Sequence, residues 1–408
     1  MKIFVLGGYG KTGIQATRLL ADSDLVTKIT VAGRNLELAE KAAREIGEKA
    51  TAVQANGTDE RELTSLLVGY DLMVNAATND AVIPSIRAAI RNKAHYCDMA
   101  WAGILEQALQ LEPQAEAAGI TAILATGISP CISNLMCVQA ASQLDEVKQF
   151  QIGRVELINF AKGIDPTPKL WLEDPKDILA ALQDYREFIE WMLNRLQNNG
   201  SRVLIELKDN SWVEVNPIDD GLNVPLAQGG NAIAYPCFSG EDAWGMAPTD
   251  LAVEKSVEMW FSPFPHPLDA VLRERAKSVL RGEIDSEAAT SAFYETIEND
   301  PYRWLTPAEN FSRIAKVWVR AVGRKEGQAA RSTCWFTNPM WYVGGYFLTS
   351  VALVAAVGII LRGEIHERGV MTAEKAFEPL PFLNEVTALM PDYLPEGKII
   401  DETFEWLT

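Results

Sequence analysis

Short apolar runs alternate with amphipathic segments over the first third of the chain. Runs typical of buried parallel strands occupy residues 2–6, 28–32, 50–54, 71–76, 94–97 and 121–125. Between them, apolar residues recur every three or four positions, as in helices that cover a sheet; the segment 102–118 is followed by Gly119, a natural helix C-cap. This alternation predicts an α/β fold with a doubly wound parallel sheet, whose ligands bind outside the carboxyl ends of the strands.

From about residue 148 the pattern changes to amphipathic strands. A second, mixed sheet is predicted from the strands 150–157, 202–208, 212–215, 257–261, 316–322 and 329–336. Apolar positions with helical spacing predict a helix over 175–196. The change of pattern therefore predicts a second domain of α+β type.

The segment 342–361 is almost free of charge and about as long as a bilayer span. A helix that is apolar on every side also suits the centre of a large α/β protein. Because the chain on both sides has a globular pattern, we expect a buried helix and no membrane partner.

The first strand runs directly into Gly8-Tyr9-Gly10-Lys11-Thr12-Gly13 and then into a helix. A pyrophosphate can lie against bare backbone N–H groups and the positive end of a helix dipole at such a turn. We assign the tight turn to Gly8, the close approach of the phosphates to Gly10, and the packing of helix on strand to Gly13. A triphosphate-binding loop would need glycine at position 5, which is Val5. The sequence predicts a dinucleotide-binding turn.

The end of the second strand indicates which dinucleotide is bound. An NAD-binding unit would place Asp or Glu here to bind the ribose 2′-hydroxyl, whereas this strand ends in Gly33-Arg34-Asn35. A guanidinium binds a 2′-phosphate bidentately, so Arg34 favours NADP(H), unless it is only a solvated surface charge. Asn35 also caps the predicted helix 36–46.

Composition favours an enzyme of the cytoplasm. The formal charge of −18 over 408 residues argues against nucleic-acid and anionic-membrane partners, because phosphate binding needs a basic face. Five cysteines without C-x-x-C spacing, and no N-terminal signal sequence, suggest reduced thiols. Three scattered histidines give no metal-ligand cluster, so we expect no metal.

Several motifs together resemble the saccharopine dehydrogenase family, in its saccharopine-reductase-like branch, over nearly the whole chain. They are the glycine-rich turn from Gly7 to Gly13, Ala32-Gly33-Arg34, 71–77 (DLMVNAA), 95–98 (HYCD), 127–130 (GISP) with Asn134, and 369–374 (GVMTAE). The resemblance implies an NADP-binding Rossmann domain over 1–130, to which 340–408 return, and an inserted substrate-binding and dimerisation domain over 131–339. It also implies NADP(H)-dependent redox chemistry at a C–N bond, in which an amine condenses with an aldehyde or keto acid. We expect a homodimer.

Candidate site residues follow the strands of the first sheet. Asn75, Ala76 and Ala77 end the fourth strand, where backbone meets the nicotinamide-side ribose, and Asp59 lies in the loop after the third strand. Asp98 closes the fifth strand and is our first choice for proton relay, although it also suits the N-cap of a helix starting near Ala102. Tyr96 and His95 are alternatives, and strand alternation prevents both from facing the substrate.

Cys131 stands where the family pattern has glycine after the proline. A thiol just before the helix starting near Ser133 would have a lowered pKa, and its thiolate would suggest aldehyde oxidation through a thiohemiacetal. The alternative is a packed, inert thiol.

Substrate carboxylates usually require arginine. Arg154 and Arg331 lie in predicted strands of the second domain and are the best candidates, with Arg202 and Arg320 weaker; each also suits an ion pair in this acidic protein. Glu241, in the aromatic and acidic stretch 235–244, suits a substrate amine. These residues favour a substrate with amine and carboxylate groups, such as a carboxylated polyamine precursor.

Two other functions remain open. An NADPH-dependent enoyl or carbonyl reductase of a lipid or polyketide would use the abundant tryptophans for an apolar pocket. A non-catalytic NADP-binding protein would bind the cofactor without turnover.

Overall fold

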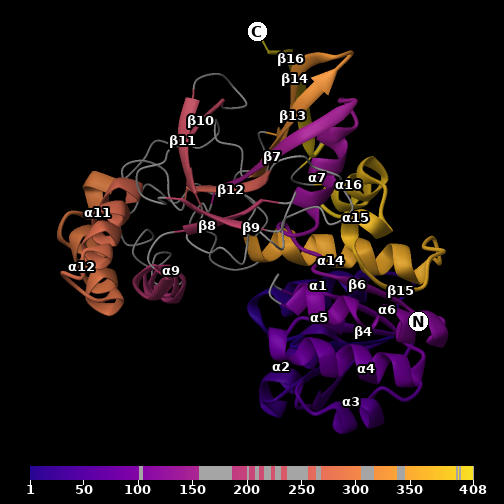
Figure 1. Ribbon diagram of the computed structural model, residues 1–408. Coiled ribbons are helices and arrows are strands. Elements are labelled where there is room, and N and C mark those ends of the chain that lie inside the picture. Colours follow the sequence, from indigo (N-terminus) through magenta and orange to yellow (C-terminus); the bar gives the residue numbers. More distant parts are fainter. Residues whose placement is uncertain are drawn as a thin grey trace. The chain divides into compact units, whose positions relative to one another are not determined.

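The computed structural model describes residues 1–100, 104–155, 186–199, 202–206, 211–215, 222–225, 231–236, 256–262, 268–304, 317–337, 345–391, 394 and 397–407. The chain forms two compact units, which are described separately (Figure 1). The N-terminal unit contains Met1–Leu135 and Gly345–Met390, and the second contains Met136–Ala247, Leu251–Gly344 and Pro391–Thr408.

The N-terminal unit is built on a seven-stranded parallel sheet with the order β15-β6-β5-β4-β1-β2-β3. Its strands are β1 (Lys2–Leu6), β2 (Lys28–Gly33), β3 (Ala50–Gln54), β4 (Leu72–Asn75), β5 (His95–Asp98), β6 (Thr121–Leu124) and β15 (Gly369–Thr372). The order reverses between β1 and β4, so the crevice at that point lies outside the carboxyl ends of these two strands. The predicted doubly wound fold is confirmed, and β15 is a strand that the sequence pattern did not reveal.

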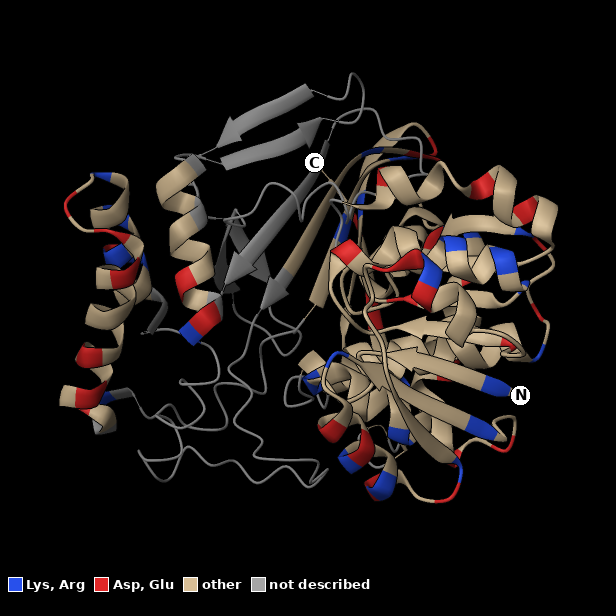
Figure 2. Ribbon diagram, turned by 90° about the horizontal axis from the view of Figure 1, so that it is seen from below, with Lys and Arg blue, Asp and Glu red and all other residues tan. Residues whose placement is uncertain are grey.

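Helices cover both faces of this sheet. They are α1 (Lys11–Asp22), α2 (Leu36–Ile46), α3 (Glu60–Leu66), α4 (Val82–Asn92), α5 (Leu105–Leu109), α6 (Glu112–Ala118), α14 (Gly345–Leu361), α15 (Ala373–Ala376) and α16 (Pro379–Ala388). α1 packs against α2 and α14, whereas α4 packs against α3, α5 and α6. Right-handed crossovers that run outward in opposite directions from β1 put their helices on opposite faces. Acidic and basic positions are interspersed along these helices (Figure 2).

The apolar segment near residue 350 forms α14. Most of its side chains are buried, including Leu348, Val351 and Leu353, as expected for a helix that is apolar on every side. No helix in the described part of the chain is both long enough and apolar enough to cross a membrane.

The second unit contains a nine-stranded mixed sheet, with the order β10-β11-β12-β7-β13-β14-β16 and β8 and β9 beside β12. Its strands are β7 (Glu146–Val155), β8 (Arg202–Glu206), β9 (Ser211–Val215), β10 (Leu222–Pro225), β11 (Asn231–Pro236), β12 (Ser256–Ser262), β13 (Val317–Lys325), β14 (Gln328–Phe336) and β16 (Ile400–Trp406). Every strand predicted for this sheet is present; β10, β11 and β16 are additional.

The helices of the second unit include α9 (Arg186–Asn199), α11 (Leu268–Leu280) and α12 (Ser286–Asn299), which pack against one another. α9 overlaps the predicted helix 175–196, of which residues 175–185 lie outside the described residues. α7 (Ile132–Ala141) begins in the N-terminal unit and ends in the second.

The C-terminal residues are divided between the two units, which differs from the prediction. The segment 340–408 was expected to return as a whole to the Rossmann domain, whereas β16 pairs antiparallel with β14 at the edge of the second sheet. Residues 391–408 therefore belong to the second unit. The reason is a complete ladder from Ile400 opposite Phe336 to Trp406 opposite Ala330, which satisfies the edge of β14.

Candidate functional site

The glycine-rich loop between β1 and α1 is shaped by contacts that only glycine permits. Gly7 has φ +75, and a Cβ there would lie 2.6 Å from the carbonyl oxygen of Ala76. A Cβ on Gly13 would lie 2.1 Å from the carbonyl oxygen of Gly7. Gly7, directly after β1, thus carries the positive φ of the turn, and Gly8 beside it is also crowded, since a Cβ there would lie 3.0 Å from Thr17 Oγ1. Gly13 packs α1 against this turn, as the sequence suggested.

The loop leaves backbone donors at the start of α1. Gly10 is the N-cap and provides no side-chain acceptor, and the first turn contains no acidic residue. Within the described chain, the amides of Lys11, Thr12 and Gly13 have no hydrogen-bond acceptor. Bare N–H groups at the positive end of a helix fit the pyrophosphate of a dinucleotide.

The end of β2 forms a second part of this candidate nucleotide-binding site, which we call the cradle. The Arg34 side chain is exposed, and its carbonyl oxygen accepts a hydrogen bond from Gln54 Nε2 at 3.0 Å. The Asn35 amide donates to the Tyr9 hydroxyl at 3.1 Å, and Asn35 Oδ1 accepts from the Leu38 amide and caps α2. The predicted cap is therefore present, and the Asn35 side chain is occupied by it.

A buried hydrogen-bond network joins the carboxyl ends of β4, β5 and β6. Asn75 Nδ2 donates to the Tyr96 hydroxyl at 3.2 Å, and the hydroxyl donates to Asp98 Oδ2 at 2.9 Å. Asp98 Oδ1 accepts from the amides of Ala100 and Ala125 at 3.0 and 2.7 Å. Asn75 Oδ1 accepts from the Ala77 amide at 3.0 Å, so the network also fixes the loop after β4.

Burial is the main influence on the pKa values of the titratable groups in this network. Asp98 is completely buried, which raises its pKa to about 6, although the amides of Ala125 and Ala100 and the Tyr96 hydroxyl oppose the shift. Burial also raises the pKa of Tyr96 well above its ordinary value. His95 accepts the Thr121 amide with Nδ1 at 3.0 Å, and its pKa is lowered by burial and then by the charge of Arg368. Asp98 and Tyr96, which the sequence offered as separate candidates, thus bond one another inside the protein, and Asp98 also accepts from the Ala100 amide.

Cys131 follows the cis Ser129–Pro130 bond and has φ +96, a left-handed conformation that favours glycine. Its side chain is completely buried, and burial followed by the charge of Glu374 raises its pKa well above the usual value. Burial and the raised pKa favour the packed thiol over the thiolate. The left-handed backbone conformation at position 131 explains why the family pattern has glycine there.

Two motifs that are distant in sequence meet beside Cys131. Ser129 Oγ donates to Ser133 Oγ at 2.9 Å, Ser133 Oγ donates to Asn134 Oδ1 at 3.2 Å, and Asn134 Nδ2 donates to Glu374 Oε2 at 3.3 Å. β15 places Glu374 there because it extends the sheet beside β6. Asn134 and Glu374 were not among the predicted site residues, although both lie in the motifs that carry the resemblance.

Of the predicted substrate-binding arginines, the structure describes the side chains of Arg331 and Arg320. Arg331 pairs with Glu405 of β16, so this guanidinium already has a carboxylate partner. Arg320 lies nearby, 4 % exposed, and donates to Gln151 Oε1 at 3.2 Å; burial and then the charge of Arg331 lower its pKa to about 10. The side chain of Arg154 and the whole of Glu241 lie outside the described residues.

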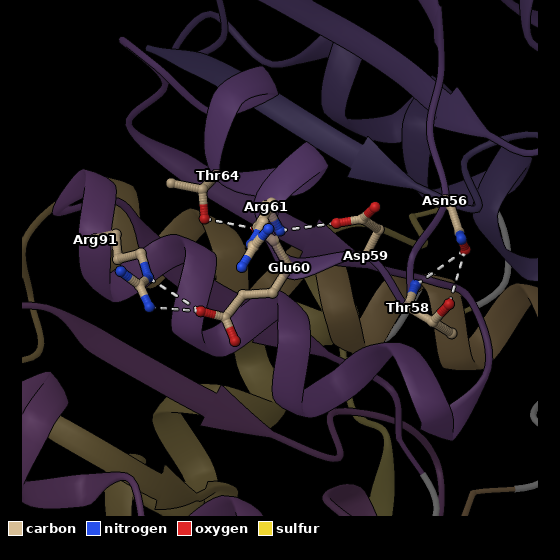
Figure 3. Close-up of a pocket in the computed structure, with 7 residues that line it drawn as sticks. All are labelled: Asn56, Thr58, Asp59, Glu60, Arg61, Thr64 and Arg91. Atoms are coloured by element: carbon tan, nitrogen blue, oxygen red, sulfur yellow. Dashed lines mark hydrogen bonds and ion pairs between the residues drawn. The ribbon is translucent and has the colours of Figure 1, made fainter.

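A surface hollow of about 880 Å³ lies beside the loop after β3 (Figure 3). Its lining residues are Asn56, Thr58, Asp59, Glu60, Arg61, Thr64 and Arg91. Asp59 Oδ1 accepts from the amides of Arg61 and Glu62 and caps α3, and Arg91 Nη2 pairs with Glu60 Oε1 at 2.8 Å. Because these polar groups satisfy one another, the carboxylate predicted to bind the cofactor acts here as a helix cap.

Comparison with known proteins agrees with this geometry. Residues 3–123 match the family model of the saccharopine dehydrogenase NADP binding domain. A curated relative, carboxynorspermidine synthase of Vibrio cholerae, is 26% identical over 197 residues, which are 42% of this chain and 48% of the relative. The match therefore spans about half of that protein.

Two solved structures share the fold over the whole chain. Apo saccharopine dehydrogenase (L-Glu forming) of Saccharomyces cerevisiae has a TM-score of 0.59 at 16% identity, covering 99% of both chains. Homospermidine synthase of Legionella pneumophila, in complex with NAD, has a TM-score of 0.53 at 13% identity, covering 100% of this chain and 91% of that one. Residues 3–123 thus match the NADP-binding domain of saccharopine dehydrogenase, and the resemblance to that family predicted from the motifs is confirmed.

Proposed function

We propose that this protein is an NADP(H)-dependent oxidoreductase that acts on a C–N bond. Its reaction is the reductive condensation of an amine with an aldehyde or keto acid, or the reverse. The observation that carries the proposal is the cradle formed by the Gly7–Gly13 loop, the free amides at the start of α1 and the exposed Arg34 at the end of β2.

The residues after β2 support NADP(H) over NAD(H). A carboxylate that accepts from the ribose 2′-hydroxyl is the usual requirement for NAD, and the position holds Arg34. Arginine donates only, and its planar fork matches a phosphate. When bound, the nicotinamide group supplies the hydride; the protein orients it and controls charge and protons around it.

Residues at the carboxyl ends of the strands would position the nicotinamide and the substrate. Asn75 holds the Ala77 amide, and Tyr96 and Asp98 hold Asn75, so the loop facing the nicotinamide-side ribose is fixed by buried hydrogen bonds. Because Asp98 is completely buried, it would act by holding Tyr96 and, through it, Asn75, and not by passing a proton directly to a substrate. Glu374, which is only partly buried, offers a more accessible carboxylate at the same edge.

The substrate class is supported by the named relatives. Carboxynorspermidine and saccharopine are amines that also carry carboxylate groups, as expected for products of an amine and a carbonyl compound. We therefore expect an aldehyde or keto acid that bears a carboxylate as one substrate.

A screen of cofactor oxidation tests the proposal. NADPH absorbance at 340 nm is followed with pairs of amines and aldehydes, including aspartate semialdehyde and aminoadipate semialdehyde, with diamines or glutamate as the amine. Turnover that requires both partners supports the C–N reaction. Turnover with an aldehyde alone would instead indicate a carbonyl reductase, and binding of NADPH without turnover of any pair would refute the proposal.

Arg34→Ala is the matched variant for cofactor choice. It should weaken NADPH far more than NADH, because only NADPH carries the phosphate that Arg34 would bind. Equal losses for the two nucleotides would refute the assignment of the 2′-phosphate to this residue.

A further inference from the structure

Tyr9 connects the glycine-rich loop to the end of β2. Its ring lies directly over Gly33, where an added Cβ would be 2.5 Å from Cε1 and 2.6 Å from the hydroxyl oxygen. The hydroxyl accepts a hydrogen bond from the Asn35 amide at 3.1 Å. Glycine at position 33 is thus required for the ring to cross the strand end.

The hydroxyl hydrogen of Tyr9 remains available. The hydroxyl uses a lone pair to accept from Asn35, and no acceptor for its hydrogen exists among the described residues. In the same part of the chain, the neighbouring Arg34 guanidinium has no carboxylate partner. Two donors without described acceptors therefore lie at the end of β2.

The backbone that carries these donors is held in place. Gln54 Nε2 donates to the Arg34 carbonyl oxygen at 3.0 Å, and the Asn35 side chain accepts from the Leu38 amide at 3.1 Å. The Asn35 amide is already used by Tyr9, so it is not free to bind a ligand. Donors fixed before binding lose little entropy when a ligand arrives, and a dianionic phosphate is the group that uses several of them.

We propose that the Tyr9 hydroxyl donates to the 2′-phosphate of NADP(H) beside Arg34 and so determines cofactor specificity. This inference rests on the proposed NADP(H) site and adds a second residue to it. Arg34 supplies charge and a bidentate fork, and Tyr9 supplies a neutral donor. A ribose 2′-hydroxyl gains much less from this pair, because it needs an acceptor to receive its hydrogen.

Tyr9→Phe tests the hydroxyl while keeping the ring over Gly33. Dissociation constants for NADPH and NADH are measured by isothermal titration calorimetry, together with adenosine 2′,5′-bisphosphate as a probe of the adenosine half alone. The variant should bind NADPH and the bisphosphate about tenfold more weakly, as expected for a lost hydrogen bond to a charged group, and NADH within about twofold. Tyr70→Phe is the matched control, because Tyr70 bonds Thr30 within the same unit and should change neither constant.

A double-mutant cycle separates direct contact from an effect through Arg34. If Tyr9 only held the Arg34–Asn35 segment, Tyr9→Phe would have no effect on bisphosphate binding in an Arg34→Ala background. We expect an additional several-fold loss there, and its absence would overturn the inference. Gly33→Ala should reproduce the loss of NADPH preference, since its Cβ displaces the ring.

The outcomes also distinguish this inference from the proposed function. Wild-type protein that binds neither nucleotide would refute both. Wild-type protein that binds NADPH selectively, with Tyr9→Phe equally selective, would refute the role of Tyr9 alone.

Discussion

Replacing Asp98 with asparagine tests how the buried network depends on charge. In Asp98→Asn, Oδ1 still accepts from the amides of Ala100 and Ala125, while the new Nδ2 faces the Tyr96 hydroxyl. The hydroxyl already accepts from Asn75, so its own hydrogen loses its acceptor. The substitution keeps the shape of the network and removes the carboxylate that accepts from Tyr96.

The expected effect of pH follows from the raised pKa of Asp98. Its pKa rises from 3.8 to about 6 on folding, so the folded state takes up a proton that the unfolded state releases. This stabilisation is fully present below about pH 3.8 and is lost as the pH rises to about 6. When the pH is lowered from 8 to 5, wild type should gain roughly 1 kcal/mol of stability that Asp98→Asn cannot gain. The thiol of Cys97 and the Tyr96 hydroxyl stay neutral throughout, because burial raises the pKa of both.

Differential scanning calorimetry of both proteins at several pH values measures this difference. A change of 1 kcal/mol moves the melting midpoint of a unit of this size by about 2–4 °C, so the gap between wild type and variant should change by about that amount. All other titrating groups are common to both proteins and cancel in the comparison. A gap that is constant with pH, or that favours wild type more as the pH rises, would refute the assignment of a raised pKa to a buried Asp98.

Two further substitutions test the backbone of the site. Cys131→Gly should be about 1 kcal/mol more stable than Cys131→Ala, because glycine relieves the strain at φ +96 while both lose the thiol; melting midpoints that rank alanine higher would contradict this. Gly13→Ala should abolish NADPH binding in titration calorimetry, since its Cβ would meet the Gly7 carbonyl oxygen at 2.1 Å. Gly358→Ala is its control, because the nearest atom is the flexible Arg362 Nη1 at 3.2 Å, and binding should be unchanged.

The first sheet was predictable from local pattern because its strands are buried on both faces. Each of the first six predicted strands has a counterpart within one or two residues, and Gly119 ends α6 with φ +74 as expected of a C-cap. β15 escaped prediction because its four residues contain no long apolar run, and only its partner β6 makes it a strand. β16 escaped for a related reason: five of its seven residues are exposed, and the ladder to β14 defines it.

The sequence predicted which residues form the candidate site better than it predicted what each of them contacts. The sequence selected Asp98, Tyr96 and Asn75 separately, since each ends or lies in a strand, and strand alternation places Tyr96 and Asp98 on one side. That they bond one another depends on the register of β4 against β5, which no local pattern gives. Arg331 shows the same limit, because its partner Glu405 comes from a strand 74 residues away.

The contacts of the C-terminal segment explain why the motifs of the resemblance are spread over nearly the whole chain. α14 packs along α1, and Ser350 Oγ donates to the Thr12 carbonyl oxygen at 2.8 Å, directly behind the glycine-rich loop. β15 then extends the sheet beyond β6 and delivers Glu374 to Asn134. The nucleotide-binding unit is therefore completed by residues more than 330 positions beyond its first helix. The motif near residue 10 and the motif near residue 370 therefore belong to one folded unit, because β1 and β15 are strands of the same sheet.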